Sequence, residues 1–305
     1  MTDSPAAPTP YEVLGVAAQA SQADLRRAYR RLLRQTHPDT AGDPARFNAV
    51  QQAWARIGDA ESRRKWDSGH QSSGVSRSND GGEAPSVPRR SPGSGSAVKA
   101  RSYGHPGGHA RERFLVLMRE WAGRGAELAD PYDEALVRSA PREIRRLLAD
   151  ALAQESTARA VSGLGIGYTI WSAVATQRGT LDHVILGPAG LFAVSSADWG
   201  SDVRLVRGEL VGDGIPAGDQ PVRSLARAAR SLGRTARVRL TATLVVVPDD
   251  AITEPITRIG RKNDAAIVRR SLLPMVLRDG LGGQRLSIED VFDVRSRLQH
   301  SIRFV

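Results

Sequence analysis

Residues 25–39 read LRRAYRRLLRQTHPD, and this stretch decides how the N-terminal part of the chain folds. Its apolar residues recur at helical spacing, which predicts an amphipathic helix with Ser21 as its N-cap. The opposite face carries the arginines Arg26, Arg27, Arg30, Arg31 and Arg34. Pro38 disfavours helical geometry at the residue before it, so we expect the helix to end there. Both His37 and Asp39 are then expected to project from a loop beside the arginines.

A second amphipathic helix is expected after this loop. Its apolar residues repeat the helical spacing and are Phe47, Val50, Ala53, Trp54 and Ile57. Two such helices joined by a short connection form an antiparallel hairpin, which lets their apolar faces be buried against each other. The region is small for a hydrophobic core but large enough for a helical module.

Five blocks of this region, taken together, resemble the J domain of Hsp40 co-chaperones. The blocks are Tyr11–Val16, Leu25–Leu32, His37–Asp39, Phe47–Trp54 and Arg63–Asp67. We therefore expect an all-α J domain over residues 8–67. The departures from the family pattern are mild, since Trp54 and Trp66 stand where tyrosine is usual.

The resemblance implies a partner and a mechanism. J domains dock on an Hsp70 of the DnaK type and stimulate its ATP hydrolysis, which is coupled to capture of a client protein. Carried over by position, the residues of the trigger are His37, Pro38 and Asp39. The electrostatic contacts are Arg26, Arg30 and Arg31, with Arg27 and Arg34 as auxiliary contacts.

The charge of the chain favours a protein partner over a nucleic acid. There are 43 Lys+Arg against 33 Asp+Glu, a net charge of +10, but most of this excess is spread thinly. The arginines of residues 25–34 are concentrated on one face, and such a face suits an acidic protein surface. That face holds no aromatic residue to stack on bases, so nucleic-acid binding is left open but not favoured. A merely solvated face is the plain alternative.

Residues 68–109 are rich in Gly, Ser and Pro, which predicts a flexible linker. This segment has no Phe, unlike the Gly/Phe region of larger Hsp40 proteins, and the chain has no cysteine for a zinc-binding client domain. The chain therefore resembles a minimal class C type J protein. Without cysteine, a signal peptide or an apolar run of membrane length, we expect a cytoplasmic protein with no membrane contact, metal or cofactor.

Residues 110–305 are expected to form a mixed α/β domain. The pattern is helical to about residue 163 and then changes to the period of strands. The strands at 168–176, 181–186 and 191–196 predict an antiparallel meander. Further elements are expected as helices at 222–234, 272–278 and 288–298 and as strands at 239–247 and 265–268. This order predicts a mixed sheet flanked by helices.

The stretch LDHVILGPAGLFAV at residues 181–194 resembles the NERD (nuclease-related) domain, which has the restriction-endonuclease-like fold. The Mg²⁺-dependent site of that family takes a Glu from a helix, an Asp from the second strand and a Glu-x-Lys from the third. The matching positions here are Glu155, Asp182, Ser195 and Ala197. Serine is a poor ligand for Mg²⁺, alanine offers none, and no lysine occurs between Lys99 and Lys262. We therefore expect this nuclease site to be vestigial.

These features lead to two candidate functions. The preferred one is a class C type J-domain co-chaperone, not an enzyme, whose degenerate nuclease-like domain selects the client or the location. The alternative is a Mg²⁺-dependent nuclease or a DNA-binding protein with an accessory J domain. A scaffold with an inactive J domain is disfavoured because His37, Pro38 and Asp39 are all present.

Overall fold

The structure is a computed structural model that describes residues 4–36, 43–69, 99–123, 128–260, 264–282 and 285–305. These residues fall into two compact units. The helical unit contains the described residues of 7–86 and 121–141, and the α/β unit contains those of 1–6, 87–120 and 142–305. The predicted trigger residues His37, Pro38 and Asp39 lie outside the described residues.

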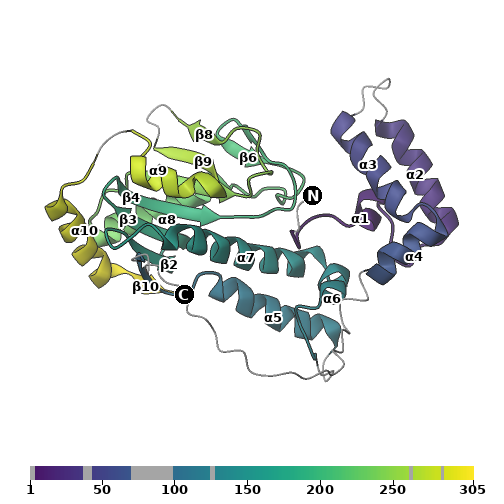
Figure 1. The fold of residues 1–305 in the computed structure, drawn as a ribbon, viewed down its shortest axis with the longest axis horizontal. Helices are drawn as coiled ribbons and strands as arrows, with labels where there is room; N and C mark the ends of the chain where they lie inside the picture. Colours follow the sequence, from purple (N-terminus) through teal and green to yellow (C-terminus); the bar gives the residue numbers. More distant parts are fainter. Residues whose placement is uncertain (1–3, 37–42, 70–98, 124–127, 261–263, 283–284) are drawn as a thin grey trace, which may run out of the picture. The chain divides into compact units, whose positions relative to one another are not determined.

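The helical unit is built around two amphipathic helices (Figure 1). Its first four helices are α1 (Pro10–Leu14), α2 (Gln22–Thr36), α3 (Pro44–Ile57) and α4 (Ala60–Gly69). Leu25 of α2 and Val50 of α3 are completely buried in a shared core, as the spacing of apolar residues predicts. The rings of Tyr29 and Trp54 stack with their centroids 4.3 Å apart. Trp54 therefore fills its position as a core aromatic residue.

Arg63 joins three parts of the helical unit. Its guanidinium donates hydrogen bonds to the carbonyls of Ala18 and Ala20, at 2.7 and 2.8 Å, and its Nε donates to the Tyr11 hydroxyl at 3.1 Å. The Tyr11 hydroxyl in turn donates to Asp67 at 2.8 Å. Since the Arg63 side chain is only 18% exposed, these bonds hold α4 against α1 and the loop that follows α1.

The helical unit also takes in a segment that we had expected in the C-terminal domain. Helix α6 (Glu134–Ser139) contributes Arg138, whose guanidinium lies 5.7 Å from the ring centroid of Trp66 on α4. The prediction of one domain over residues 110–305 is therefore wrong for residues 121–141. The sequence pattern misses this packing because a cation–π contact between distant residues leaves no local periodicity.

The α/β unit is built on an eight-stranded sheet in the described residues, with strand order β1-β2-β3-β4-β7-β9-β8 and β10 also paired with β2. The strands are β1 (Arg101–Tyr103), β2 (Thr169–Thr176), β3 (Gly179–Gly187), β4 (Gly190–Ser196), β7 (Ala242–Val247), β8 (Ile256–Ile259), β9 (Ala265–Arg269) and β10 (Arg303–Phe304). Strands β2, β3 and β4 form the predicted antiparallel meander, and β7 and β9 continue parallel to β4. A separate hairpin joins β5 (Arg204–Val206) to β6 (Glu209–Val211).

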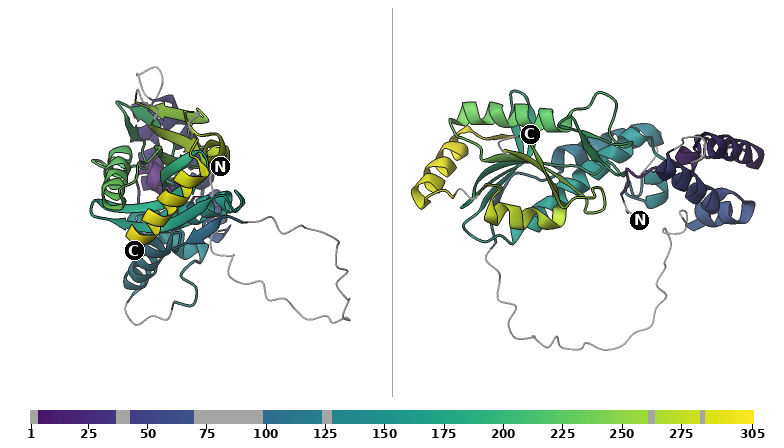
Figure 2. Two further views of the ribbon diagram at one scale, coloured as in Figure 1. Left: turned by 90° about the vertical axis from the view of Figure 1, so that its left-hand side faces the viewer. Right: turned by 90° about the horizontal axis from the view of Figure 1, so that it is seen from above.

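Helices cover both faces of the sheet. Helices α8 (Pro221–Ala236) and α10 (Ile288–Ser301) share one hydrophobic core with it, and α7 (Arg142–Ser162) and α9 (Leu273–Asp279) share the other. Figure 2 shows α8 and α9 on opposite sides of the strands. The sequence prediction of a mixed sheet flanked by helices is confirmed.

The predicted linker of residues 68–109 extends too far. Residues Arg101–Tyr103 form β1, which pairs in parallel with β2, and helix α5 (Gly108–Ala122) begins at Gly108. A three-residue strand surrounded by Gly and Pro has no detectable period of its own, and only its pairing with a distant strand defines it. Residues 99–120 therefore belong to the α/β unit.

Gly190 lies where two strands come unusually close. It begins β4 with a φ of 132°, and a Cβ at this position would lie 2.0 Å from Oγ1 of Thr241. That hydroxyl accepts a hydrogen bond from the Leu191 amide at 3.0 Å, so it cannot move away without losing the bond. The turn between β3 and β4 therefore requires glycine.

Replacing Arg63 by Ala should destabilise the helical unit by about 2 kcal/mol, because two backbone carbonyls and the Tyr11 hydroxyl lose their charged donor. Hydrogen–deuterium exchange of the full chain should show faster exchange in α1 and α4 but not in the sheet. Arg64→Ala is the matched control, since Arg64 is exposed and bonds only within its own helix, to the carbonyl of Ala60. Equal exchange in the two variants would contradict the role of Arg63.

Candidate functional site: an arginine face on helix α2

Helix α2 separates its apolar and cationic residues onto opposite faces. Its N-terminus is capped by Ser21, whose Oγ accepts the Asp24 amide at 3.2 Å. Leu25, Ala28 and Leu32 are buried against α3. The five predicted arginines are all exposed, and we call them the α2 arginine face: Arg26, Arg27, Arg30, Arg31 and Arg34.

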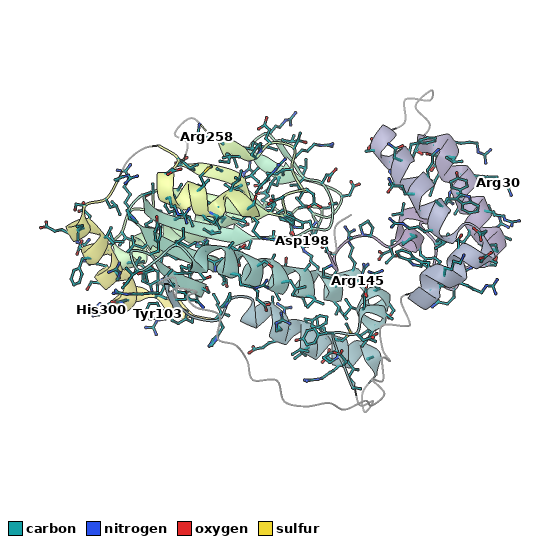
Figure 3. All side chains as sticks on the ribbon, in the orientation of Figure 1. Arg30, Tyr103, Arg145, Asp198, Arg258 and His300 are labelled. Atoms are coloured by element: carbon teal, nitrogen blue, oxygen red, sulfur yellow. The ribbon has the colours of Figure 1, made fainter. Side chains whose placement is uncertain are left out.

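Most of the charge on this face has no partner within the described chain. Arg27 pairs with Asp24 at 3.4 Å, but both side chains are largely exposed, so the pair contributes little. Among the described residues, no carboxylate forms an ion pair with Arg26, Arg30 or Arg31. Figure 3 shows Arg30 pointing outward from α2. These three cations are therefore free to meet an acidic partner surface.

The segment that holds the predicted trigger lies between the end of α2 and the start of α3. Thr36 closes the described part of α2, and its buried hydroxyl donates to the carbonyl of Leu32 at 2.8 Å. Helix α3 starts after Asp43, whose side chain accepts the amide of Ala45 at 2.9 Å. The predicted trigger, His37, Pro38 and Asp39, lies between Thr36 and Asp43 and outside the described residues, so it stays a prediction.

The second predicted site lies in the α/β unit, around Asp182 of β3. Its Oδ2 accepts the Ser196 amide at 2.7 Å and the Ser195 hydroxyl at 3.0 Å. Burial raises the pKa of Asp182 to about 6, and the bonds from Ser196 and Ser195 oppose this shift. Because both donors come from β4, Asp182 joins the ends of two neighbouring strands.

The structure separates Glu155 from this group. Glu155 lies on α7 as predicted, but its Oε1 accepts a hydrogen bond from Nε of Arg111, on α5, at 2.9 Å. The α7 carboxylate whose charge acts together with that of Asp182 is Asp150. Sequence reasoning did not single out Asp150, and the helical period gives no signal for it, because buried residues of α7 share helical rows with both Asp150 and Glu155.

Asp150 lies in an unfavourable electrostatic environment. Burial raises the pKa of its carboxyl group to about 7. The Arg146 guanidinium opposes this increase, whereas the charges of Asp182, Asp198 and Asp219 add to it. The folded domain therefore holds the proton of Asp150 at a pH where the unfolded chain has lost it.

The residues around Asp182 do not fit a Mg²⁺ site. The Ser195 hydroxyl is used as a donor to Asp182, and Ala197 has no donor atom. Asp198 could replace a lost ligand, but its Oδ1 accepts the amide of Gly200 at 2.9 Å. Within the described ranges, no three His, Cys, Asp or Glu residues are grouped as metal ligands.

A Ser-His-Asp triad is also absent from this region of the described structure. His183 is adjacent to Asp182 in sequence but faces β2, where its Nδ1 lies 3.0 Å from the Ser172 hydroxyl. Complete burial lowers the pKa of His183 to about 4, so the ring is neutral near pH 7. Neighbouring strand residues point to opposite faces, which separates His183 from the bond between Asp182 and Ser195.

Comparison with known proteins identifies the helical unit. Residues 9–67 match the family model described as DnaJ domain. Identities are 46% over 57 residues to a DnaJ protein homolog of Cucumis sativus and 43% over 60 residues to the chaperone protein DnaJ of Cyanothece sp.. A "Tetratricopeptide repeat and J domain-containing co-chaperone DNJ1" of Mycosarcoma maydis is 41% identical over 59 residues.

These matches are confined to the N-terminal region. Each covers 19% of this chain, and they cover 14%, 16% and 10% of the three relatives. The prediction of an N-terminal J domain is therefore confirmed over residues 9–67. In the part of the chain that the structure describes, no helix is long and apolar enough to cross a membrane.

Asp150→Asn should make the α/β unit more stable at pH 8 and leave its stability near pH 4 unchanged. The carboxyl pKa is about 7 in the folded state and about 3.9 in the unfolded chain, so the unfolding free energy of the wild type falls as pH rises between these values. The gain at pH 8 should exceed about 1 kcal/mol, since one pKa unit corresponds to about 1.4 kcal/mol.

Differential scanning calorimetry of the full chain at the two pH values tests this expectation. Asp202→Asn is the control, because Asp202 is an exposed carboxylate of the same unit. A gain for Asp150→Asn that is equal at both pH values would contradict the assignment.

Proposed function

We propose that this chain is a class C type J-domain co-chaperone of the cytoplasm, which binds a DnaK-type Hsp70 and stimulates its ATP hydrolysis. The observation that carries the proposal is the α2 arginine face, exposed on a J domain and free of ion pairs at Arg26, Arg30 and Arg31 among the described residues. Arginine holds its charge at any physiological pH and binds carboxylates in a bidentate manner. The face therefore steers an acidic Hsp70 surface toward the domain.

The two parts of the J domain have different tasks in this proposal. The α2 arginine face accelerates encounter and orients the partner, which is the usual effect of complementary charge. His37, Pro38 and Asp39 then act as the trigger that stimulates hydrolysis by the partner. The chain itself supplies no catalytic residue, because ATP is bound and hydrolysed by the Hsp70.

We assign the α/β unit to selection of the client or the location, as a degenerate relative of the NERD domain. Support comes from the order of its elements, since a helix (α7) precedes the meander, Asp182 lies on its second strand and Ser195 on its third. A nuclease is the less favoured alternative, because the donor set around Asp182 does not fit Mg²⁺.

His37→Gln should abolish stimulation of ATP hydrolysis, because it removes a trigger residue and leaves the α2 arginine face intact. Single-turnover hydrolysis by a DnaK-type Hsp70, with and without the full chain, measures this effect. Stimulation that is equal for wild type and His37→Gln would overturn the assigned trigger, and no stimulation by the wild type would overturn the co-chaperone function.

Charge reversal at Arg26, Arg30 and Arg31 to Glu should lower the association rate with Hsp70 by at least about tenfold at low salt. The difference from wild type should shrink at 0.5 M salt, where the screening length is only a few ångströms. Surface plasmon resonance at several salt concentrations tests this. Arg64→Glu is the control on the exposed side of α4, and an equal effect of this variant would show that net charge alone is responsible.

The nuclease alternative has its own test. DNA incubated with the full chain and Mg²⁺ should remain intact under the co-chaperone proposal. Cleavage that disappears in Asp182→Ala would support the alternative instead. Cleavage that persists in this variant would point to a different site or a contaminating enzyme.

A further inference from the structure

Helix α8 carries a second arginine face, in the α/β unit. Its exposed arginines follow helical spacing, and we call them the α8 arginine face: Arg223, Arg227, Arg230 and Arg234. No Asp or Glu occurs anywhere in the helix, which spans Pro221–Ala236. The opposite side, with Val222, Leu225 and Leu232, is buried in the sheet core. The arginines are therefore held at the surface in a row about 16 Å long.

This face is not neutralised by the described chain. In the described structure, the guanidinium groups of Arg223 and Arg227 donate to neutral side chains, those of Gln220 and Ser224, whereas the backbone amide of Arg223 donates to the Glu209 carboxylate at 3.2 Å. Among the described residues, Arg230 and Arg234 have neither an ion pair nor a hydrogen bond from their side chains. Like charges three and four residues apart destabilise a helix by a few tenths of a kcal/mol per pair. Folding alone gives no reason for this arrangement, whereas an anionic partner does.

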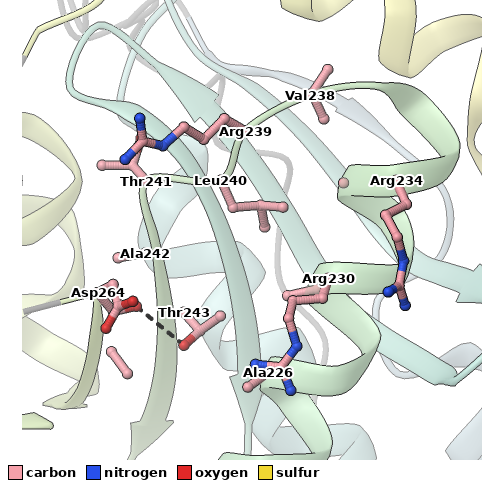
Figure 4. Close-up of a pocket in the computed structure, with 13 residues that line it drawn as sticks. Ala226, Arg230, Arg234, Val238, Arg239, Leu240, Thr241, Ala242, Thr243 and Asp264 are labelled. Carbon is pink, nitrogen blue, oxygen red and sulfur yellow. Dashed lines mark hydrogen bonds between the residues drawn. The ribbon is translucent and has the colours of Figure 1, made fainter. Parts of the chain in front are cut away.

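The C-terminal half of the face borders a pocket of about 660 Å³ (Figure 4). Arg230 and Arg234 project from α8, and Arg239 comes from the connection that leads to β7. The rest of the lining includes the apolar Val238 and Leu240, and also one carboxylate, Asp264, against the three guanidinium groups. Cationic groups at the rim and an apolar interior suit a ligand that has both negative charge and an apolar group.

We propose that the α8 arginine face and this pocket bind an acidic segment of a partner protein, with an apolar side chain in the pocket. Alternate carboxylates of an extended peptide lie about 7 Å apart, close to the roughly 6 Å rise from Arg230 to Arg234. Each guanidinium can bind a carboxylate through two hydrogen bonds. This inference rests on the proposed targeting role of the α/β unit and not on stimulation of Hsp70.

The lining of the pocket favours a peptide over a nucleic acid. A single strand of DNA or RNA gains much of its affinity from stacking its bases on aromatic rings. The residues that line this pocket include no Phe, Tyr, Trp or His. An aliphatic or aromatic side chain of a peptide, in contrast, can be buried against Val238 and Leu240 without stacking.

An array of twelve-residue peptides tests the proposal. The peptides carry from zero to four Glu at alternate positions and either Leu, Phe or Ser at the centre, and the labelled full chain is the probe in solution. Binding should increase with the number of Glu and should require Leu or Phe. No binding anywhere on the array, or binding that ignores the number of Glu, would overturn the proposal.

Matched variants locate the binding surface. For the best peptide, fluorescence anisotropy should show at least a tenfold weaker affinity for Arg230→Glu/Arg234→Glu and less than a twofold change for Arg178→Glu/Arg258→Glu, two exposed arginines on other elements. Leu240→Ser should weaken peptides with a central Leu but not those with Ser. Equal loss in both double variants would overturn the assigned surface, since net charge alone would then explain the binding.

Two further measurements separate the outcomes. In the first, a labelled dT12 oligonucleotide is tested for binding. If it binds more tightly than every peptide, and this binding is lost in Arg230→Glu/Arg234→Glu, the proposal of a peptide ligand is overturned in favour of a nucleic acid. Stimulation of Hsp70 ATP hydrolysis should be unchanged in this variant, because the J domain is intact. Failure of the wild type to stimulate Hsp70 would leave the peptide result standing, so the two proposals fail separately.

Discussion

The structure depends on one constraint, which is that an arginine side chain is costly to bury without partners. An unpaired buried charge costs several kcal/mol, more than a marginally stable domain can lose. Arg145 shows the permitted exception, since it is 1% exposed and its Nη1 lies 3.5 Å from the carbonyl of Pro5. Most arginines of helices α2 and α8 have no such partners among the described residues. Each helix can therefore pack only in the orientation about its axis that leaves these arginines exposed. The packing of the apolar side thereby determines which surface remains cationic.

The cost of burying charge also accounts for the environment of the aspartates in the α/β unit. Asp182 was expected at a vestigial Mg²⁺ site, and in the structure its carboxylate accepts two hydrogen bonds from β4. A hydroxyl and an amide cost much less to bury than a divalent cation and its ligands. The Asp182 carboxylate thus links the ends of two strands. Burial raises the pKa values of both Asp150 and Asp182, and for Asp150 the charges of neighbouring aspartates add to this increase.

Much of this fold could be predicted from the sequence, because its main elements have strong local patterns. Helices α2 and α3 follow from apolar spacing, and the meander follows from alternation around a glycine turn. The short strands β1, β8 and β10 could not be predicted, since two to four residues show no period and only their pairing with distant strands defines them. Residues 121–141 were misassigned for a similar reason, as their packing depends on contacts such as that of Arg138 with Trp66.

The candidate sites show the same difference between local and distant information. The α2 arginine face was predicted in full, because exposure on an amphipathic helix depends on spacing alone. Glu155 was assigned to the helix position of the motif, whereas in the structure its carboxylate accepts a hydrogen bond from Arg111 and the α7 carboxylate whose charge is coupled to Asp182 is Asp150. The helical period does not distinguish the two, because buried residues of α7 share rows with both: Thr157 with Asp150, and Leu148 and Ala151 with Glu155.

Two cationic faces in one chain raise the question of how their partners are kept apart. Charge alone cannot do this, because any acidic surface is attracted to both and long-range attraction is not selective. Selectivity between the two partners must come from the residues that lie beside the arginines on each face. On α2 that addition is the predicted trigger sequence that follows the helix, whereas on α8 it is an apolar pocket beside Arg230 and Arg234. An Hsp70 surface without an apolar side chain that fits the pocket gains no affinity from the α8 face. A partner that has such a side chain finds no pocket for it on α2, so each proposed partner is favoured at one face only.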